Sequence, residues 1–357
     1  MFVRQSWYVA AWADEIEPGR MLSRVLLGDA VLLYRTEAGH AVALEDRCCH
    51  RALPLSHGRV IGEQVQCGYH GLVYDSRGRC VKVPGQERVP PAACVRRYEL
   101  VEQDHLLWIW MGDEGQARPA EIPRHPWHDD AGWAWVKDRY LVRANYQLIT
   151  DNLMDLTHVG YVHGRTIGGT PQAHSEADNT VKATANGVKV LRWMPDSVPP
   201  PAYTAAHKFN TERVDRWMEI EFFPPSTVRI HTGAVDAGTG APEGRREGGT
   251  AFMGLNVQTP ETATTTHYFW SGALSQTPER PANCPQLHAS LATTFAEDRV
   301  VVEAQQISLE LRPDAPLVKI ASDGGMVRAR RLVSALIERE SGRASPEAPS
   351  VAIHAGR

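Results

Sequence analysis

The sequence predicts an α+β protein in two parts: an all-β N-terminal domain, then a domain that combines an antiparallel sheet with long helices. Three observations support this fold class. Residues 28–113 read as short apolar runs broken by turns, which is typical of strands. Residues 182–274 contain further runs rich in Val, Ile, Thr and aromatic side chains. Residues 286–311 contain neither Pro nor Gly, as a long helix requires.

The elements of each part follow from local patterns. Residues 30–34 and 41–44 flank a short polar connection and predict a hairpin, and residues 106–111 predict a buried strand. Residues 115–130 contain three prolines and predict a connection between domains. We therefore expect a first domain over residues 1–115 and a second over residues 116–357. Three further predictions concern the second domain, namely a helix over 146–163, a long loop over 233–249 and a helix over 324–341.

Composition narrows the classes of function. The chain has 357 residues, a formal net charge of −4 and 22% charged residues, which gives no reason to expect nucleic acid or an anionic membrane as a partner. No stretch approaches the roughly 20 apolar residues of a membrane helix, and the start lacks the apolar core of a signal peptide. We expect the protein in the cytoplasm, where its six cysteines would not form a disulfide framework.

Two short motifs predict an iron–sulfur cluster. Cys48 and His50 form a Cys-x-His pair, Cys67 and His70 form a Cys-x-x-His pair, and sixteen residues lie between the two pairs. Two loops that each offer one thiolate and one imidazole match the ligands of a Rieske [2Fe–2S] cluster, with two Cys on one iron and two His on the other. Cys49 occupies the x position, and the spacing excludes it as a ligand.

A zinc site is the alternative reading of these four residues. Zinc sites of the Cys₂His₂ type place a pair of Cys before a pair of His, whereas each loop here mixes one Cys with one His. The order therefore favours the Rieske cluster. Pro84 and Gly85 predict a third loop that covers the cluster.

A second constellation predicts a mononuclear iron. His158 and His163 lie five residues apart near the end of the predicted helix, with Gly160 available to loosen its last turn. Asp155 precedes His158 by three residues, so we expect its carboxylate to hydrogen-bond the His158 ring, and Asn152 lies one turn further back on the same face. Two histidines and one carboxylate form the facial triad of non-haem Fe(II) oxygenases.

The carboxylate of this triad must come from elsewhere in the chain. Asp298, on the predicted long helix, is the preferred candidate, while Glu297 and Glu303 on the same helix remain alternatives. Sequence spacing alone does not decide among the three.

With both motifs present, the chain resembles the oxygenase α-subunits of Rieske non-haem iron enzymes over nearly its whole length. It is most similar to the group that contains vanillate O-demethylase, dicamba monooxygenase and toluenesulfonate methyl-monooxygenase. The segments that carry the resemblance are residues 7–12, the two cluster loops, and residues 151–163, 240–246, 258–262 and 297–299.

The resemblance implies an N-terminal Rieske domain, a C-terminal helix-grip (START-like) catalytic domain and a homotrimer. In such a trimer Asp155 connects His70 of one chain to His158 of the next. The resemblance also implies a reductase that uses NADH, flavin and its own [2Fe–2S] centre, and O₂ as co-substrate. The expected activity is oxidation of a methyl or O-methyl group of a small aromatic acid or sulfonate. A ring-dihydroxylating dioxygenase and a Rieske electron-transfer protein are the alternatives.

Substrate contacts are predicted on one strand. Residues 227–232 alternate, so that Ile230 faces one side and Arg229 and His231 face the other. In similar enzymes the positions that match Ile230 and Asn256 face the substrate. Arg229 is suited to bind a carboxylate or sulfonate, but the alternation places it on the wrong face. We therefore favour a structural ion pair for Arg229, and the same argument counts against His231 and Trp270 as substrate contacts.

Overall fold

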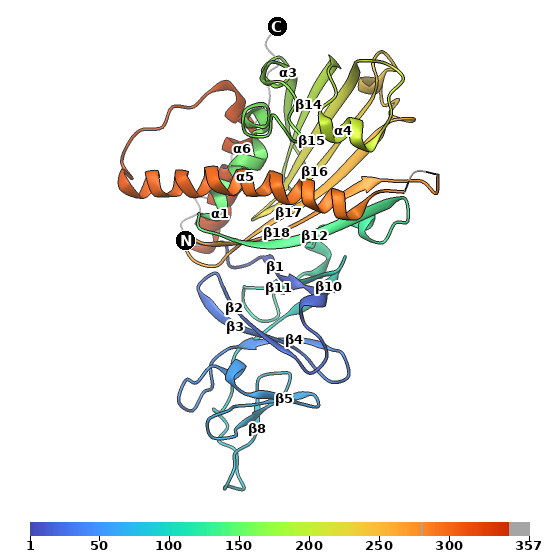
Figure 1. The fold of residues 1–357 in the computed structure, drawn as a ribbon. Coiled ribbons are helices and arrows are strands. Elements are labelled where there is room, and N and C mark those ends of the chain that lie inside the picture. Colours follow the sequence, from blue (N-terminus) through green and yellow to red (C-terminus); the bar gives the residue numbers. More distant parts are fainter. Residues whose placement is uncertain (280, 343–357) are drawn as a thin grey trace.

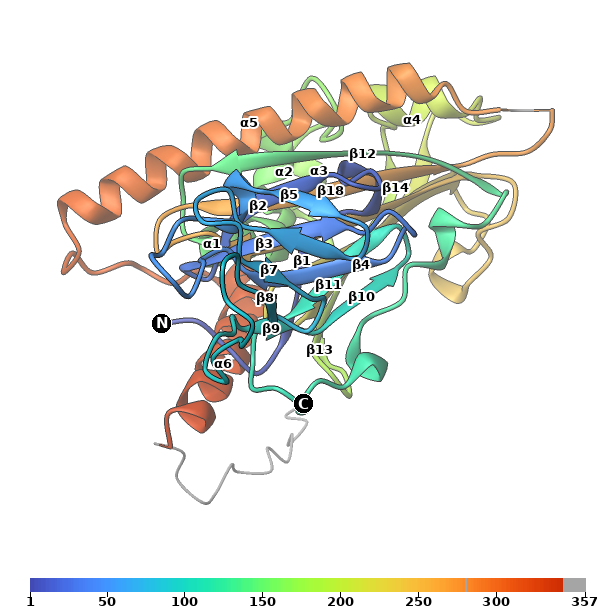
Figure 2. The same cartoon turned by 90° about the horizontal axis from the view of Figure 1, so that it is seen from below.

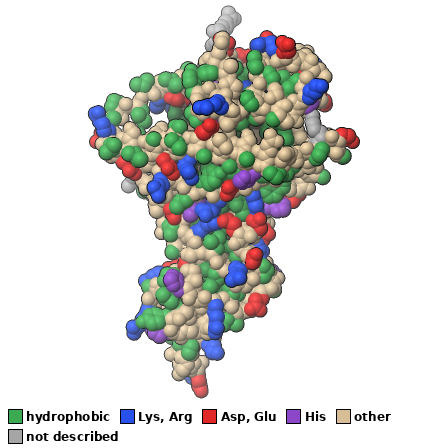
Figure 3. Space-filling view, viewed as in Figure 1, with side chains coloured by type: hydrophobic (Ala, Val, Ile, Leu, Met, Phe, Trp, Pro, Cys, Tyr) green, Lys and Arg blue, Asp and Glu red, His purple; other side chains and the backbone are tan. Residues whose placement is uncertain are grey.

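The structure, a computed structural model, describes residues 1–279 and 281–342. A smaller N-terminal part built from three β-sheets projects from a larger part with one wide sheet and long helices (Figures 1 and 3). This arrangement confirms the predicted α+β class. Residues 343–357 of the predicted second domain lie outside the described residues.

The N-terminal part stacks its sheets along the long direction of the molecule (Figure 1). One sheet has the order β1-β11-β10, the next β2-β3-β4-β9, and the last β5-β6-β7-β8. Their bounds are β1 Trp7–Trp12, β2 Met21–Leu26, β3 Asp29–Arg35, β4 Ala41–Glu45, β5 Arg59–Ile61, β6 Gln64–Gln66, β7 Val73–Tyr74, β8 Cys80–Lys82, β9 Arg97–Tyr98, β10 Leu100–Gln103 and β11 Leu106–Trp110. β3 and β4 pair antiparallel, which confirms the predicted hairpin.

The C-terminal part contains a seven-stranded antiparallel sheet in the order β12-β18-β17-β16-β15-β14-β13. Its strands are β12 Trp133–Val142, β13 Asp178–Ala183, β14 Val188–Ser197, β15 Val214–Phe223, β16 Thr227–Asp236, β17 Thr250–Pro260 and β18 Thr266–Ser275. The helices are α1 Tyr146–Met154, α2 Val159–Val162, α3 Pro171–Ser175, α4 Pro201–Ala206, α5 Cys284–Leu311 and α6 Gly324–Glu340. α5 runs across the sheet as the predicted long helix (Figures 1 and 2).

The wide sheet has two different apolar faces. Its inner face packs against α1, α5 and α6, and this core includes Val190, Ile220 and Val228. Its outer face shares a second core with the first N-terminal sheet, where Leu255 packs among tryptophans that include Trp108. The wide sheet therefore fixes the N-terminal part on one side and leaves the other side for the helices and the site.

The prediction of one continuous helix over residues 146–163 is wrong, because the helix breaks near the middle of this range. α1 ends at Met154, because Asp155 adopts an extended backbone and its carboxylate caps the next turn by accepting from the Thr157 N–H. A short 3₁₀ turn, Leu156–His158, and α2 follow. Gly160 serves close packing and not a loosened turn, because a Cβ on it would lie 2.7 Å from the Cα of Pro171 in α3.

The predicted long loop over 233–249 is also shorter than expected, since β16 extends to Asp236. Gly233 lies inside that strand, where a Cβ would meet the Trp217 ring at 2.1 Å. The glycine is there for packing and not for a turn. None of the helices in the described part of the chain combines the length and apolar content that a bilayer crossing needs.

The contact between the two parts contains buried histidines that are held neutral. His128 hydrogen-bonds the Asp104 carbonyl and the Ser271 hydroxyl, and His267 hydrogen-bonds the Val25 carbonyl. Burial lowers the pKa of His128 to about 4 and that of His267 to about 4, and it also holds the pKa of His125 well below its usual value.

We predict that the free energy of unfolding falls at acid pH because these buried histidines bind a proton more readily in the unfolded chain. Between the unfolded pKa near 6.5 and the folded pKa near 4, the unfolded chain binds more protons, so the free energy of unfolding falls as pH falls. From pH 7 to pH 5, His128 alone should account for a loss of about 2 kcal/mol. Denaturant unfolding of the wild type and His128→Gln at both pH values measures this. An equal pH dependence in both proteins would contradict the assignment.

Candidate functional site

The two cluster loops meet at the end of the N-terminal part that lies away from α5 (Figure 1). Cys48 and Cys67 are almost fully buried, whereas His50 and His70 are exposed with their ring centroids 4.5 Å apart. Burial and the neighbouring Cys48 sulfur raise the pKa of the Cys67 thiol, so two thiolates at this point need positive charge beside them. This donor set fits a cluster with an inner iron on sulfur and an outer iron on imidazole.

Two neighbours complete the cluster loops. Gly71 has φ +72°, and Pro84 approaches it so closely that a Cβ there would lie 3.0 Å from the proline ring. The predicted third loop therefore packs on the second. The Tyr74 hydroxyl lies 3.1 Å from the Cys48 sulfur and 3.2 Å from that of Cys49. Sequence spacing gave no signal for Tyr74, although a hydrogen bond to a cluster sulfur adjusts its reduction potential.

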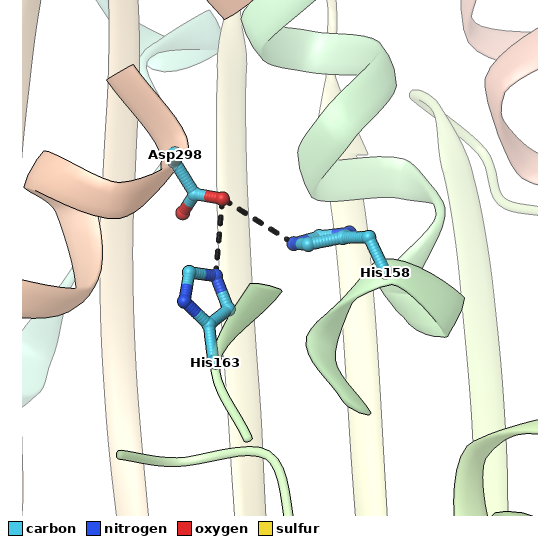
Figure 4. A group of neighbouring side chains, drawn as sticks. All are labelled: His158, His163 and Asp298. Atoms are coloured by element: carbon cyan, nitrogen blue, oxygen red, sulfur yellow. Dashed lines mark hydrogen bonds and ion pairs between the residues drawn. The ribbon is translucent and has the colours of Figure 1, made fainter. Parts of the chain in front are cut away.

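The three predicted iron ligands, His158, His163 and Asp298, lie close together in the structure (Figure 4). Ligand atoms of His158, His163 and Asp298 all lie within 4.8 Å of one another. Asp298 Oδ1 is 3.0 Å from His163 Nε2 and 3.4 Å from His158 Nε2. The three residues come from the turn before α2, from the end of α2 and from α5, so the site depends on how α5 crosses the sheet.

Each imidazole is held from behind so that its Nε2 faces the same point. The His163 Nδ1–H donates to Glu297 Oε2 at 2.7 Å, and the His158 Nδ1–H donates to the Asp155 carbonyl at 2.7 Å. Metal-binding histidines are commonly oriented by such an acceptor on their second nitrogen. Glu297 is therefore placed behind a histidine, and Glu303 accepts from the Arg143 N–H instead.

The expected contact between the Asp155 carboxylate and the His158 ring is absent. The carboxylate accepts from Thr157 and from the Ser322 hydroxyl, while the backbone carbonyl of Asp155 receives the imidazole N–H. The reason is the end of α1 at Met154, which turns Asp155 away from the face that helical spacing assigned to it. The Asn152 amide, on α1, donates to Asp298 Oδ1 at 3.1 Å.

Electrostatics favour a cation among these residues. Burial alone would raise the pKa of Asp298, but hydrogen bonds and charge from His158 and His163 outweigh it and lower the pKa to about 2. Burial would likewise lower the pKa of His163, yet Asp298 and Glu297 raise it. A buried carboxylate anion thus faces two imidazoles, which is the ligand set of a non-haem iron site.

A cavity of about 330 Å³ opens beside the triad. Its wall is mostly apolar, and Ile230 and Asn256 both line it, as do Met218, Thr232 and Tyr203. The predicted ion pair of Arg229 is confirmed, because its guanidinium binds Glu221 and packs over the Phe223 ring. Neither Arg229 nor any other Lys or Arg of the described residues lines the cavity.

Comparison with known proteins agrees with this site. Residues 6–99 match the Rieske [2Fe–2S] domain family, and residues 142–339 match the vanillate O-demethylase oxygenase C-terminal domain family. The iron–sulfur subunit of a toluene-4-sulfonate monooxygenase system from Comamonas testosteroni is 40% identical over 97% of this chain and 100% of its own length. A vanillate O-demethylase oxygenase subunit from a Pseudomonas species is 35% identical over 95% and 96%.

A solved structure of dicamba monooxygenase with non-haem iron and dicamba superposes with a TM-score of 0.81 at 30% identity, covering 96% of this chain and 99% of that one. The two metal sites and the fold thus define the class as the oxygenase component of a Rieske monooxygenase. Within that class, the chain belongs to the family with the vanillate O-demethylase type of C-terminal domain. Its cofactors are a Rieske [2Fe–2S] cluster and a mononuclear non-haem iron.

These comparisons confirm the predicted family and type of enzyme. The two matched regions leave residues 100–141 unassigned, so the boundary between predicted domains 1–115 and 116–357 stays a prediction.

Proposed function

We propose that this monooxygenase oxidises a methyl or O-methyl group of a small aromatic acid or sulfonate. The observation that carries the proposal is the apolar cavity whose wall contains His158, His163 and Asp298. Its volume of about 330 Å³ is at the small end of ligand pockets and suits a single aromatic ring. The relatives from Comamonas and Pseudomonas are named for toluene-4-sulfonate and vanillate.

Different residues would bind the iron, bind the cluster, orient the iron ligands and place the substrate. His158 and His163, through Nε2, and Asp298, through Oδ1, would hold the mononuclear iron, and Cys48, His50, Cys67 and His70 would hold the cluster. When bound, the iron supplies the oxidation of a substrate C–H bond by O₂ with electrons from the cluster. Glu297 and the Asp155 carbonyl keep the two imidazoles oriented. Ile230 and Met218 exclude water and place the ring, and Asn256 offers a neutral polar contact.

The overall reaction balances with one O₂. An aryl methyl group, O₂, two electrons and two protons give a benzylic alcohol and water. An O-methyl group gives a hemiacetal that breaks down to a phenol and formaldehyde. We propose that the electrons come from NADH through a separate reductase with flavin and a [2Fe–2S] centre. Because this reductase needs NADH, we also propose a cytoplasmic location.

The direct test uses isotopically labelled oxygen. The purified protein, a class-matched reductase and NADH are given ¹⁸O₂ with toluene-4-sulfonate or 4-methoxybenzoate, and products are identified by mass spectrometry. We expect a benzylic alcohol that carries one ¹⁸O, or 4-hydroxybenzoate with formaldehyde. A ring diol that carries two ¹⁸O atoms would show a dioxygenase. Reduction of the cluster without any oxygen uptake would show an electron-transfer protein.

The ligand assignment makes a separate prediction about metal content. Asp298→Ala should lose about one iron per chain and keep its acid-labile sulfide, because the cluster lies in the other part of the molecule. Glu297→Gln should weaken iron binding by about 10- to 100-fold, since it only orients His163. Glu303→Ala on the same helix is the matched control and should retain its iron. Iron loss from Glu303→Ala, or its retention in Asp298→Ala, would contradict the assignment.

We also propose a homotrimer in which the cluster of one chain serves the iron of its neighbour. Within one chain the exposed His50 follows β4 and the exposed His70 follows β6. The sheet that contains β5 and β8 lies at the end of the molecule opposite to α5, the helix that carries Asp298 (Figure 1). α5 and the segment after it expose apolar side chains that a neighbour can cover: Val300, Ile307, Leu311, Leu317, Val318 and Ile320. In this assembly Asp155 would connect His70 of one chain to His158 of the next.

Mixed assemblies test transfer between chains. Cys67→Ser removes the cluster and Asp298→Ala removes the iron, so each variant alone should be inactive. Co-expressed together, they should regain a measurable fraction of wild-type oxygen uptake, because some neighbours pair an intact cluster with an intact iron. Co-expression of Cys67→Ser with Cys48→Ser is the control and should stay inactive. Absence of activity in isolated mixed trimers would contradict transfer between chains.

A further inference from the structure

Two arginines are buried on the inner face of the wide sheet without an acidic partner. Arg192 in β14 is 2% exposed and Arg216 in β15 is fully buried. Neither forms an ion pair with a carboxylate of the described residues, in contrast to the buried Arg24, which pairs with Glu15. Arginine keeps its charge in proteins, and a buried charge is costly unless an anion balances it. These two guanidinium groups thus carry buried positive charge that no carboxylate in the described part of the chain neutralises by a direct ion pair.

The donors of these arginines are also incompletely used. Arg216 donates from Nη1 to the Gly168 carbonyl at 3.3 Å, and Arg192 donates from Nη2 to the His174 carbonyl. Nε and Nη2 of Arg216 and Nε of Arg192 are buried, and residues 1–279 and 281–342 provide no acceptor for them. Burial lowers the pKa of Arg192, and the charge of Asp155 only partly opposes this. The Asp155 carboxylate itself accepts hydrogen bonds from Thr157 and Ser322. Buried donors of this kind are normally paired, so these unpaired guanidinium donors indicate a site for an anionic acceptor.

Arg216 lies directly behind one end of the cavity. Arg216 and Met218 are two residues apart on β15, so both side chains project from the inner face of the sheet. Met218 lines the cavity. The guanidinium lies over the ring of Tyr203, 4.8 Å from its centroid, and Tyr203 is itself part of the cavity wall. The Tyr203 hydroxyl hydrogen-bonds Thr232, a second residue of the cavity wall, so the guanidinium packs on the outer side of that wall.

The triad lies toward the other end of the same cavity. Strand register places Asn256 opposite Val228, and Phe252 opposite Thr232. The Asn256 side chain accepts from Tyr268, which, like Asn152 and Asp298, lines the small hollow beside the triad. Phe252 instead packs on Tyr203, with ring centroids 5.2 Å apart. The cavity therefore runs from the triad to Tyr203 and Arg216.

We infer that Arg216 binds the carboxylate or sulfonate of the substrate at the Tyr203 end of the cavity. The Tyr203 ring turns away from the guanidinium, and Nε and Nη2 then form the paired contact that a planar guanidinium offers to two oxygens of one anion. The methyl group lies at the opposite end, beside the triad. A ring with its anion and its methyl in para positions fits this arrangement better than an ortho isomer.

This inference rests on the proposed function and identifies Arg216 as the cation that would bind the substrate anion. It also explains how a cavity whose described lining contains no Lys or Arg can accept an aromatic acid. Arg229, which the sequence makes a candidate to bind the anion, faces the other side of the sheet and pairs with Glu221. It therefore provides a matched control on the neighbouring strand.

The test compares a charged probe with its neutral counterpart. Toluene-4-sulfonate and toluene-4-sulfonamide have nearly the same shape, and calorimetric titration of the holoprotein gives the affinity for each. The wild type should bind the sulfonate at least about tenfold more tightly, and Arg216→Met should lose that preference while its affinity for the sulfonamide changes little. Arg229→Met should keep the wild-type ratio. Toluene-2-sulfonate should bind the wild type more weakly than the 4-isomer.

Several outcomes would overturn the inference: equal affinity of the wild type for the two probes, a preference retained in Arg216→Met, or a preference lost in Arg229→Met. Thermal unfolding checks that each variant is folded. If Arg216→Met does not fold, Arg216→Lys replaces it, because it keeps the charge and loses the paired donors, and the preference should fall without vanishing. Labelled benzylic alcohol from toluene-4-sulfonamide without any preference for the anion would leave the proposed function standing and reject this subsite. Arg216-dependent binding without any C–H oxidation would do the reverse.

Discussion

The convergence of two imidazole Nε2 atoms on Asp298 Oδ1 is the interaction on which the site depends. It requires α5 to cross the sheet at one position, because a shift by one residue along that helix would replace Asp298 with a neighbour on another face. The Glu297 carboxylate uses that other face to hold His163. Asp298 and Glu297 are adjacent on α5 but have different roles, because the helix directs Asp298 toward the cavity and Glu297 toward Nδ1 of His163.

The wide sheet connects this site to the rest of the molecule. Its outer face joins the N-terminal part through a core of tryptophans and aliphatic side chains, and its inner face provides the cavity floor. Alternation along each strand separates these tasks residue by residue. On β15, Met218 and Arg216 point inward, while Trp217 points outward and packs with Val235 and Ala241. Neutral polar side chains such as Asn256 also lie on this inner face, but Arg192 and Arg216 bring buried charge to it.

Much of this arrangement could be predicted from the sequence. The Cys and His spacings identified the cluster loops, and strand alternation correctly separated Ile230 from Arg229. The strand β12 was missed, because Lys137, Asp138 and Arg139 interrupt its apolar pattern. The break at Asp155 was missed because Asp can cap a turn or occupy a helix, and only the backbone shows which. The roles of Tyr74 and Arg216 depend on contacts between distant segments, and no local pattern reveals such contacts.

The central claim is that one chain holds both a Rieske cluster and a separate iron. Iron and acid-labile sulfide content of the purified protein, with an EPR spectrum after reduction by dithionite, tests this claim most directly. The account predicts about three irons and about two sulfides per chain, with the low average g value of a histidine-ligated cluster. About two irons and two sulfides that do not change after incubation with Fe(II) would contradict it, because the triad would then be unable to hold a metal. Zinc without sulfide would reject the cluster as well.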